Sequence, residues 1–144
     1  MLNCDYTEML RLLNASGARY LVVGAYAVIY YTEPRFTRDL DLWIDRTPEN
    51  ARRTLQALAE FGAPVEGMQS VLEEADMVLQ IGIEPLRIDI MTGLSGLEFE
   101  AAWQNSVPDV WDGVPVRFLS KTDLISSKQA AGRPKDRLDL EELL

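Results

Sequence analysis

Hydrophobic and polar positions follow two periods along the chain, and these periods predict helices alternating with strands. Apolar residues at helical spacing predict a first helix, for which Asp5 and Glu8 resemble a capping box. The run RYLVV, residues 19–23, is typical of a buried strand. Gly24 then ends this strand before a short helix in residues 25–31.

Residues 34–45, PRFTRDLDLWID, read as a strand with two unlike faces. One face carries the apolar side chains Phe36, Leu40, Leu42 and Ile44, with Arg38 as its one charged residue. The other face carries Arg35, Thr37, Asp39 and Asp41. The strand therefore has an apolar face to bury, and its polar face carries two carboxylates separated by one residue.

The next helix begins after Thr47, with Pro48 in its first turn and Gly62 as its end. Residues 66–76 are compatible with a short helix or a loop. A strand pair follows in MVLQIG and LRIDIM, joined through residues 83–85.

The C-terminal third predicts a helix in residues 96–104 and a hairpin whose turn is Asp112-Gly113. Ser120 and Asp123 suggest a capping box for a further helix, and Pro134 begins a last, acidic one. The sum is a mixed α/β (α+β) fold, a small mixed sheet flanked by helices. At 144 residues the chain is expected to form one domain, residues 1–144.

Composition limits the kinds of ligand, metal site and cellular location that we expect. Net charge is −9, which argues against a broad electrostatic grip on nucleic acid but not against a small phosphate ligand that carries its own cation. The chain has no histidine, so any metal must be held by oxygen ligands, as Mg²⁺, Mn²⁺ and Ca²⁺ are. One cysteine, no signal peptide and no apolar run long enough to span a bilayer predict a cytoplasmic protein without a membrane partner.

Three aspartates are candidates for a metal site. Asp39 and Asp41 should lie roughly 6 to 7 Å apart at Cα on one strand face, so the pair must share a proton or a cation. Asp89, in LRIDIM, is a lone acid between isoleucines, and it completes a three-carboxylate cluster if its strand lies beside residues 39–44. Such a cluster can hold two divalent ions and suits phosphoryl chemistry. Weaker candidates, each at an expected strand end or turn, are Glu33, Asp45 and Glu84.

Candidates for phosphate binding lie elsewhere in the chain. Gly24 and Ala25 are small residues where a strand turns into a helix, so a phosphate can approach the backbone N–H groups. Lys128 shares a helical face with apolar residues, and a cation on the core side needs an anion. Arg133 begins a local basic cluster with Lys135 and Arg137.

Each feature also has a plainer interpretation. Asp39 and Asp41 alone fit a solvated strand face, and Gly24 alone fits an ordinary turn. Lys128 could extend past its apolar neighbours to water, and RPKD could be only the start of a helix. The combination and order of the features favour the functional interpretation.

That combination resembles a known family. Residues 20–45, YLVVGAYAVIYYTEPRFTRDLDLWID, are similar to the minimal nucleotidyltransferase domain of the DNA polymerase β superfamily, and in particular to AbiEii-type toxins and related small bacterial proteins. The shared pattern is a strand, a Gly-Gly or Gly-Ser turn, a helix and then R-x-T-x-D-[IL]-D, matched here by Gly24, Arg35, Thr37, Asp39 and Asp41. RIDIMTG, FEAAW and DLISSKQAAGRPKDRLDLEEL follow in the family's order, so the resemblance extends from about residue 19 to the C-terminus.

The resemblance implies a nucleotidyltransferase fold with Mg²⁺, or Mn²⁺, at Asp39, Asp41 and Asp89. It also implies that Asp89 helps to deprotonate the acceptor hydroxyl. A nucleoside triphosphate would bind near Gly24, with phosphate contacts from Ala25, Arg35, Thr37, Lys128 and Arg133. Where the family has Gly or Ser this chain has Ala25, which removes one hydroxyl that could bond a phosphate.

The expected activity is transfer of a nucleoside monophosphate to an acceptor hydroxyl on a protein, RNA or small molecule. The resemblance also implies a role in a toxin–antitoxin or phage-defence pair, in which a cognate toxin or antitoxin would be the partner. Two alternatives remain open: a catalytically inactive binding partner with the same fold, as an antitoxin-like module would be, and a metal-dependent nuclease that uses the same acids.

Overall fold

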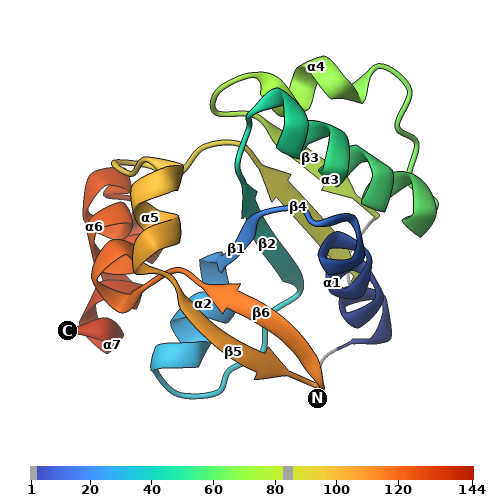
Figure 1. Cartoon of the computed structure of the whole chain (residues 1–144). Coiled ribbons are helices and arrows are strands. Elements are labelled where there is room, and N and C mark those ends of the chain that lie inside the picture. Colours follow the sequence, from blue (N-terminus) through green and yellow to red (C-terminus); the bar gives the residue numbers. More distant parts are fainter. Residues whose placement is uncertain (1–2, 83–85) are drawn as a thin grey trace.

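The computed structural model describes residues 3–82 and 86–144, and six strands within them form one mixed sheet (Figure 1). The strand order is β3-β4-β2-β1-β6-β5. β1 pairs antiparallel with β2 and parallel with β6, and β2 pairs parallel with β4. The two outer pairs, β3–β4 and β5–β6, are antiparallel. The strands are β1 Tyr20–Val23, β2 Asp39–Ile44, β3 Val78–Ile81, β4 Arg87–Met91, β5 Val107–Trp111 and β6 Val114–Phe118.

Helices cover both faces of this sheet (Figure 1). What we term the first face packs against α1 Cys4–Ser16, α3 Pro48–Phe61 and α4 Met68–Glu73. The second face packs against α2 Gly24–Tyr31, α5 Phe99–Asn105, α6 Lys121–Ala131 and α7 Pro134–Leu143. No helix in the described part of the chain is both long enough and apolar enough to cross a bilayer.

The alternation of β2 divides its side chains between two hydrophobic clusters. Leu40, Leu42 and Ile44 are fully buried in the cluster on the first face. Trp43 belongs to the cluster on the second face, and Asp39 and Asp41 share its parity along the strand. The polar face predicted for this strand is therefore the second face, left open where the helices do not cover it.

Most of the predicted helix ends and turns are confirmed. Thr47 accepts a hydrogen bond from the Asn50 backbone N–H, and Gly62 ends α3 in the left-handed conformation. Ser120 caps α6 by accepting from the Asp123 N–H at 3.1 Å. The Asp112-Gly113 turn has positive φ at both residues, as a two-residue hairpin requires.

Two predictions about element ends are wrong. The cap of α1 is Asn3, whose side chain accepts from the Asp5 N–H at 2.8 Å, so Asp5 lies inside the helix. β2 begins at Asp39 rather than near residue 34, and the side chain of Phe36 is 80% exposed instead of facing the core. The pairing explains the shorter strand, because the register with β4 begins at Asp39 and β1 has already turned into α2.

The uncertain middle of the chain resolves into the short helix α4 within residues 66–76. The expected strand pair is present as β3 and β4 in antiparallel register. Its joining residues 83–85, and with them Glu84, lie outside the described residues.

Candidate active site

A cleft of about 1360 Å³ opens between the second face of the sheet and the C-terminal helices α6 and α7. The loop after β4 forms part of its wall with residues 93–98. The nine residues that the sequence analysis assigned to the metal and phosphate sites all line this cleft: Gly24, Ala25, Arg35, Thr37, Asp39, Asp41, Asp89, Lys128 and Arg133. Residues from five separate segments therefore meet at one site.

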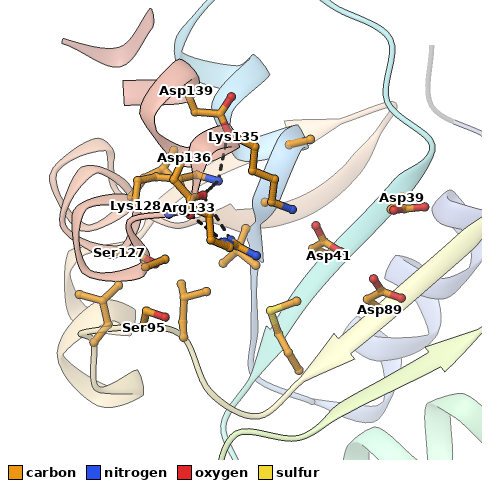
Figure 2. Close-up of a pocket in the computed structure, with 18 of the residues that line it drawn as sticks. Asp39, Asp41, Asp89, Ser95, Ser127, Lys128, Arg133, Lys135, Asp136 and Asp139 are labelled. Carbon is orange, nitrogen blue, oxygen red and sulfur yellow. Dashed lines mark hydrogen bonds and ion pairs between the residues drawn. The ribbon is translucent and has the colours of Figure 1, made fainter. Parts of the chain in front are cut away.

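The three aspartates lie on two neighbouring parallel strands. Asp41 and Asp89 are register partners across the β2–β4 pair. Partners in register on adjacent strands point to the same face, and Asp39 shares the parity of Asp41. Figure 2 shows the three carboxylates grouped on one side of the cleft. The tertiary structure thus brings Asp89 to the face that carries the other two acids.

Arg87 lies among these acids, a position for which the sequence analysis assigned no role. Its Nη2 donates to Asp39 Oδ2 at 2.9 Å and to Asp89 Oδ2 at 3.3 Å. Its Nε lies 3.1 Å from Asp89 Oδ1. Because Arg87 is two residues before Asp89 on β4, its side chain extends along the same face and neutralises part of the charge there.

The surroundings of Asp41 raise the pKa of its carboxyl group. Burial, the charge of Asp89 with a hydrogen bond to it, and the charge of Asp39 together raise the pKa of Asp41 to about 7, while Lys135 opposes the shift. Near neutral pH this group is therefore poised between its two protonation states. A cation beside it would restore full ionisation.

The donor set fits Mg²⁺ or Mn²⁺. Within the described segments, the buried oxygen Asp39 Oδ1 has no hydrogen-bond partner, and Asp89 Oδ1 has only the ion-pair contact with Arg87 Nε. Carboxylate oxygens are the ligands that these hard cations prefer. In this arrangement, no three His, Cys, Asp or Glu side chains of residues 3–82 and 86–144 converge closely enough to hold a metal ion. Metal binding at all three acids would require Arg87 to rearrange.

Gly24 makes room for this arrangement. Its φ is +65°, and a Cβ built on it would lie 2.0 Å from Asp41 Oδ2. The Asp41 carboxylate thus packs directly on the glycine, which begins α2 without any side-chain cap on the helix. The backbone N–H groups of that first turn lie beside Ala25 at the cleft, a setting that suits an anion.

Lys128 lines the cleft but is already paired. Its Nζ lies 3.2 Å from Asp136 Oδ1 and 3.1 Å from Asp139 Oδ2. Arg133 forms two hydrogen bonds with the same Asp136: Nε donates to Oδ2 at 2.7 Å, and Nη2 donates to Oδ1 at 3.2 Å. The anions that an inward-facing Lys128 requires are thus supplied by α7.

Arg35 is also paired, since its Nη1 donates to Asp139 Oδ1 at 3.0 Å. This bond ties the segment before β2 to α7. Thr37 lies half-buried on the same segment. Of the weaker acidic candidates in the described residues, Glu33 is exposed and Asp45 pairs with Arg19 at 3.3 Å.

Several cleft residues were not identified as site residues from the sequence. Lys135 lines the cleft and acts electrostatically on Asp41. The RPKD run contained it, but the sequence did not distinguish it from its basic neighbours. Ser95 and Ser127, labelled in Figure 2, also line the cleft. A hydroxyl in a loop or helix carries no periodic signal, so neither could be found before the fold was known.

Comparison with known proteins adds a family and a fold. The family model described as "Nucleotidyltransferase of unknown function (DUF6036)" matches residues 4–144. The chain is similar in structure to the lincosamide antibiotic adenylyltransferase LnuA, solved with lincomycin bound, at a TM-score of 0.62 and 17% sequence identity. The similarity covers 99% of this chain and 96% of LnuA. No curated protein sequence matches.

These results confirm the predicted nucleotidyltransferase fold, a mixed sheet flanked by helices. They also confirm the broad part of the resemblance, since the matched family consists of nucleotidyltransferases. The narrower AbiEii-type assignment stays a prediction.

Proposed function

This chain belongs to the family of nucleotidyltransferases of unknown function, and from that premise we propose a Mg²⁺- or Mn²⁺-dependent reaction at the cleft. The enzyme would move a nucleoside monophosphate from a nucleoside triphosphate to an acceptor hydroxyl and release pyrophosphate. The observation that carries this proposal is the register of Asp41 with Asp89, which collects three carboxylates beside the uncapped first turn of α2.

The residues that line the cleft would have different roles, according to where each one lies. Asp39, Asp41 and Asp89 would hold the divalent cation, which supplies positive charge to the phosphoryl oxygens. Asp89 also accepts the proton of the acceptor hydroxyl. Backbone N–H groups at Gly24 and Ala25 bind phosphate oxygens at the helix terminus. Arg35 and Thr37 border the phosphate site from the segment that leads into β2.

The direct test is label transfer from each of the four α-labelled nucleoside triphosphates, together with pyrophosphate release. Asp41→Asn should lower the transfer rate by at least about 100-fold, because the charge that holds the cation and the developing phosphoryl charge in place is lost. Glu60→Gln is the matched control, since Glu60 is an exposed carboxylate on α3 away from the cleft. Folded wild-type protein that binds none of the four nucleotides would contradict the proposal.

A second candidate is a catalytically inactive binding partner, and a specific contact favours it. Arg87 holds oxygens of both Asp39 and Asp89, and Ala25 lacks the hydroxyl expected at its position. Equal label transfer by wild type and Asp41→Asn would support this candidate. Pyrophosphate release without strand cleavage would separate a transferase from a nuclease that uses the same acids.

The acceptor is a hydroxyl of a protein, an RNA or a small molecule. LnuA is named for an antibiotic acceptor, which supports testing small molecules first. The net charge of −9 disfavours a long RNA. The AbiEii-type resemblance supports a cytoplasmic toxin–antitoxin or phage-defence pair. Expression with and without the product of the adjacent gene tests that role through cell growth.

A further inference from the structure

The cations at the C-terminal side of the cleft differ in whether a carboxylate already compensates them. Lys128, Arg133 and Arg35 each form an ion pair with a carboxylate of α7. Lys135 forms none with any residue in the described ranges 3–82 and 86–144. This difference assigns the four side chains to two roles.

Lys128 is a buried member of a closed network. The side chains of Lys128, Asp136 and Asp139 are 10%, 0% and 10% exposed. Withdrawing Lys128 toward a nucleotide would take away one of the two cations that each of these buried carboxylates contacts, which is unfavourable. Its bonds instead join α6 to α7 across the back of the cleft.

Arg133 and Arg35 pair with the two aspartates that Lys128 contacts, Arg133 with Asp136 and Arg35 with Asp139. Arg133 makes a two-point contact with Asp136, which also accepts from the Arg133 backbone N–H at 3.1 Å as a capping box. Arg35 holds Asp139 and lies 3.9 Å from Glu142. Three cations thus face three carboxylates, and the network carries no net charge to attract an anion.

Lys135, unlike these three cations, has no carboxylate partner in the described residues. It follows Pro134 in the first turn of α7, directly before the fully buried Asp136. The network therefore fixes its backbone while its side chain stays exposed. Figure 2 shows the amine extending across the cleft toward Asp41, and its charge acts on that carboxylate. This uncompensated ammonium lies opposite the three acids, where it can contact an anion bound between them.

We propose that Lys135 binds the triphosphate of the nucleotide, and that Lys128 is a structural residue that joins α6 to α7. The inference rests on the proposed function, because that function supplies the phosphate ligand. It replaces Lys128 with Lys135 as the phosphate-binding lysine of this chain.

The test measures binding of MgATP and of magnesium tripolyphosphate by calorimetry. Lys135→Ala should weaken both by about 10- to 100-fold, the effect of losing a charge-assisted hydrogen bond, and Lys135→Arg should restore most of the affinity. Arg137→Ala is the matched control, since Arg137 is an exposed cation on the same helix that does not line the cleft. Its affinity should stay within about twofold of wild type.

Lys128 gives the complementary measurement. Lys128→Met should lower the melting temperature, yet at a temperature where circular dichroism shows it folded it should bind tripolyphosphate within about threefold of wild type. Lys128→Arg keeps a charge beside Asp136 and Asp139 and serves as a second variant if the methionine variant does not fold. Strong loss of binding with an unchanged melting temperature in either variant would overturn the assignment.

The outcomes separate this inference from the function on which it rests. If folded wild-type protein binds neither ligand, the proposed function and this inference both fall. If wild type binds both ligands and Lys135→Ala binds them equally well, only this inference falls.

Discussion

At the residue scale, the site concentrates like charges that destabilise the fold. Asp39, Asp41 and Asp89 share one face, and Arg87 offsets only part of their repulsion. Gly24 leaves the space that Asp41 fills. The repulsion among the three carboxylates opposes stability, and a cation bound between them would relieve it.

The raised pKa of Asp41 predicts a pH-dependent stability without metal. The pKa is about 7 in the folded protein against an ordinary value of 3.8, so between these pH values the folded state binds the additional proton. The free energy of unfolding therefore falls as pH rises through this window. In EDTA, Asp41→Asn should be more stable than wild type by about 1–3 kcal/mol at about pH 8, with the advantage shrinking toward about pH 4. Urea denaturation measures both, and parallel pH profiles would contradict the prediction.

Gly24→Ala should cost more than backbone strain alone. The added methyl meets Asp41 Oδ2, so we expect destabilisation above about 2 kcal/mol and loss of nucleotide binding. Gly62→Ala is the control, because Gly62 has φ +98° with no atom within 4 Å of the built Cβ. That variant should lose about 1–2 kcal/mol and keep its affinity. Thermal melting and calorimetry provide the comparison, and equal losses in the two variants would show that Asp41 does not pack on Gly24.

At the element scale, side chains from helices secure the strands that hold the acids. Asn50 on α3 accepts from the Arg19 N–H at 2.6 Å and donates to the carbonyls of Arg19 at 3.1 Å and Asp45 at 2.6 Å. It thus joins the start of β1 to the end of β2. Tyr6 on α1 plays a similar part at the other end, where its hydroxyl donates to the carbonyl oxygens of Arg38 and Arg87.

Asn50→Ala should destabilise the protein by about 2–4 kcal/mol, because buried backbone groups lose their partners. The effect belongs to the strand ends away from the cleft, so the nucleotide affinity of the folded fraction should be unchanged. Denaturant unfolding and calorimetry on the same samples measure both quantities. Gln104→Ala, which removes an exposed amide on α5, serves as the control. A loss of affinity at wild-type stability would place Asn50 in the site instead.

At the scale of the whole molecule, one sheet separates two hydrophobic clusters, and the site lies on only one of them. β1, with all four residues buried, belongs to both clusters through its alternating side chains. Such a shared central strand couples the two layers.

The prediction of one domain therefore has a direct test. Fluorescence of a Trp111→Phe variant reports Trp43 and Trp103 on the second face, whereas far-ultraviolet circular dichroism is dominated by the helices on both faces. In urea both signals should change with one midpoint, as in two-state unfolding. Separate midpoints would divide the chain into two independently folding units.

The sequence alone predicted what local chemistry controls. Helix ends at Thr47, Gly62 and Ser120 depend on neighbouring residues only, and the alternation in residues 39–44 places two acids on one face wherever the strand lies. The order of motifs also indicated the nucleotidyltransferase family. These features need no knowledge of distant contacts.

Tertiary structure alone decided the rest. The β2–β4 register sets Asp89 beside Asp41 and starts the strand at Asp39, and packing of α7 against α6 buries Lys128 while Lys135 stays exposed. Each of these outcomes depends on a partner in another strand or helix rather than on neighbouring residues. Periodicity can state which way a side chain points within its own element, but only the packing of elements determines which charge it meets.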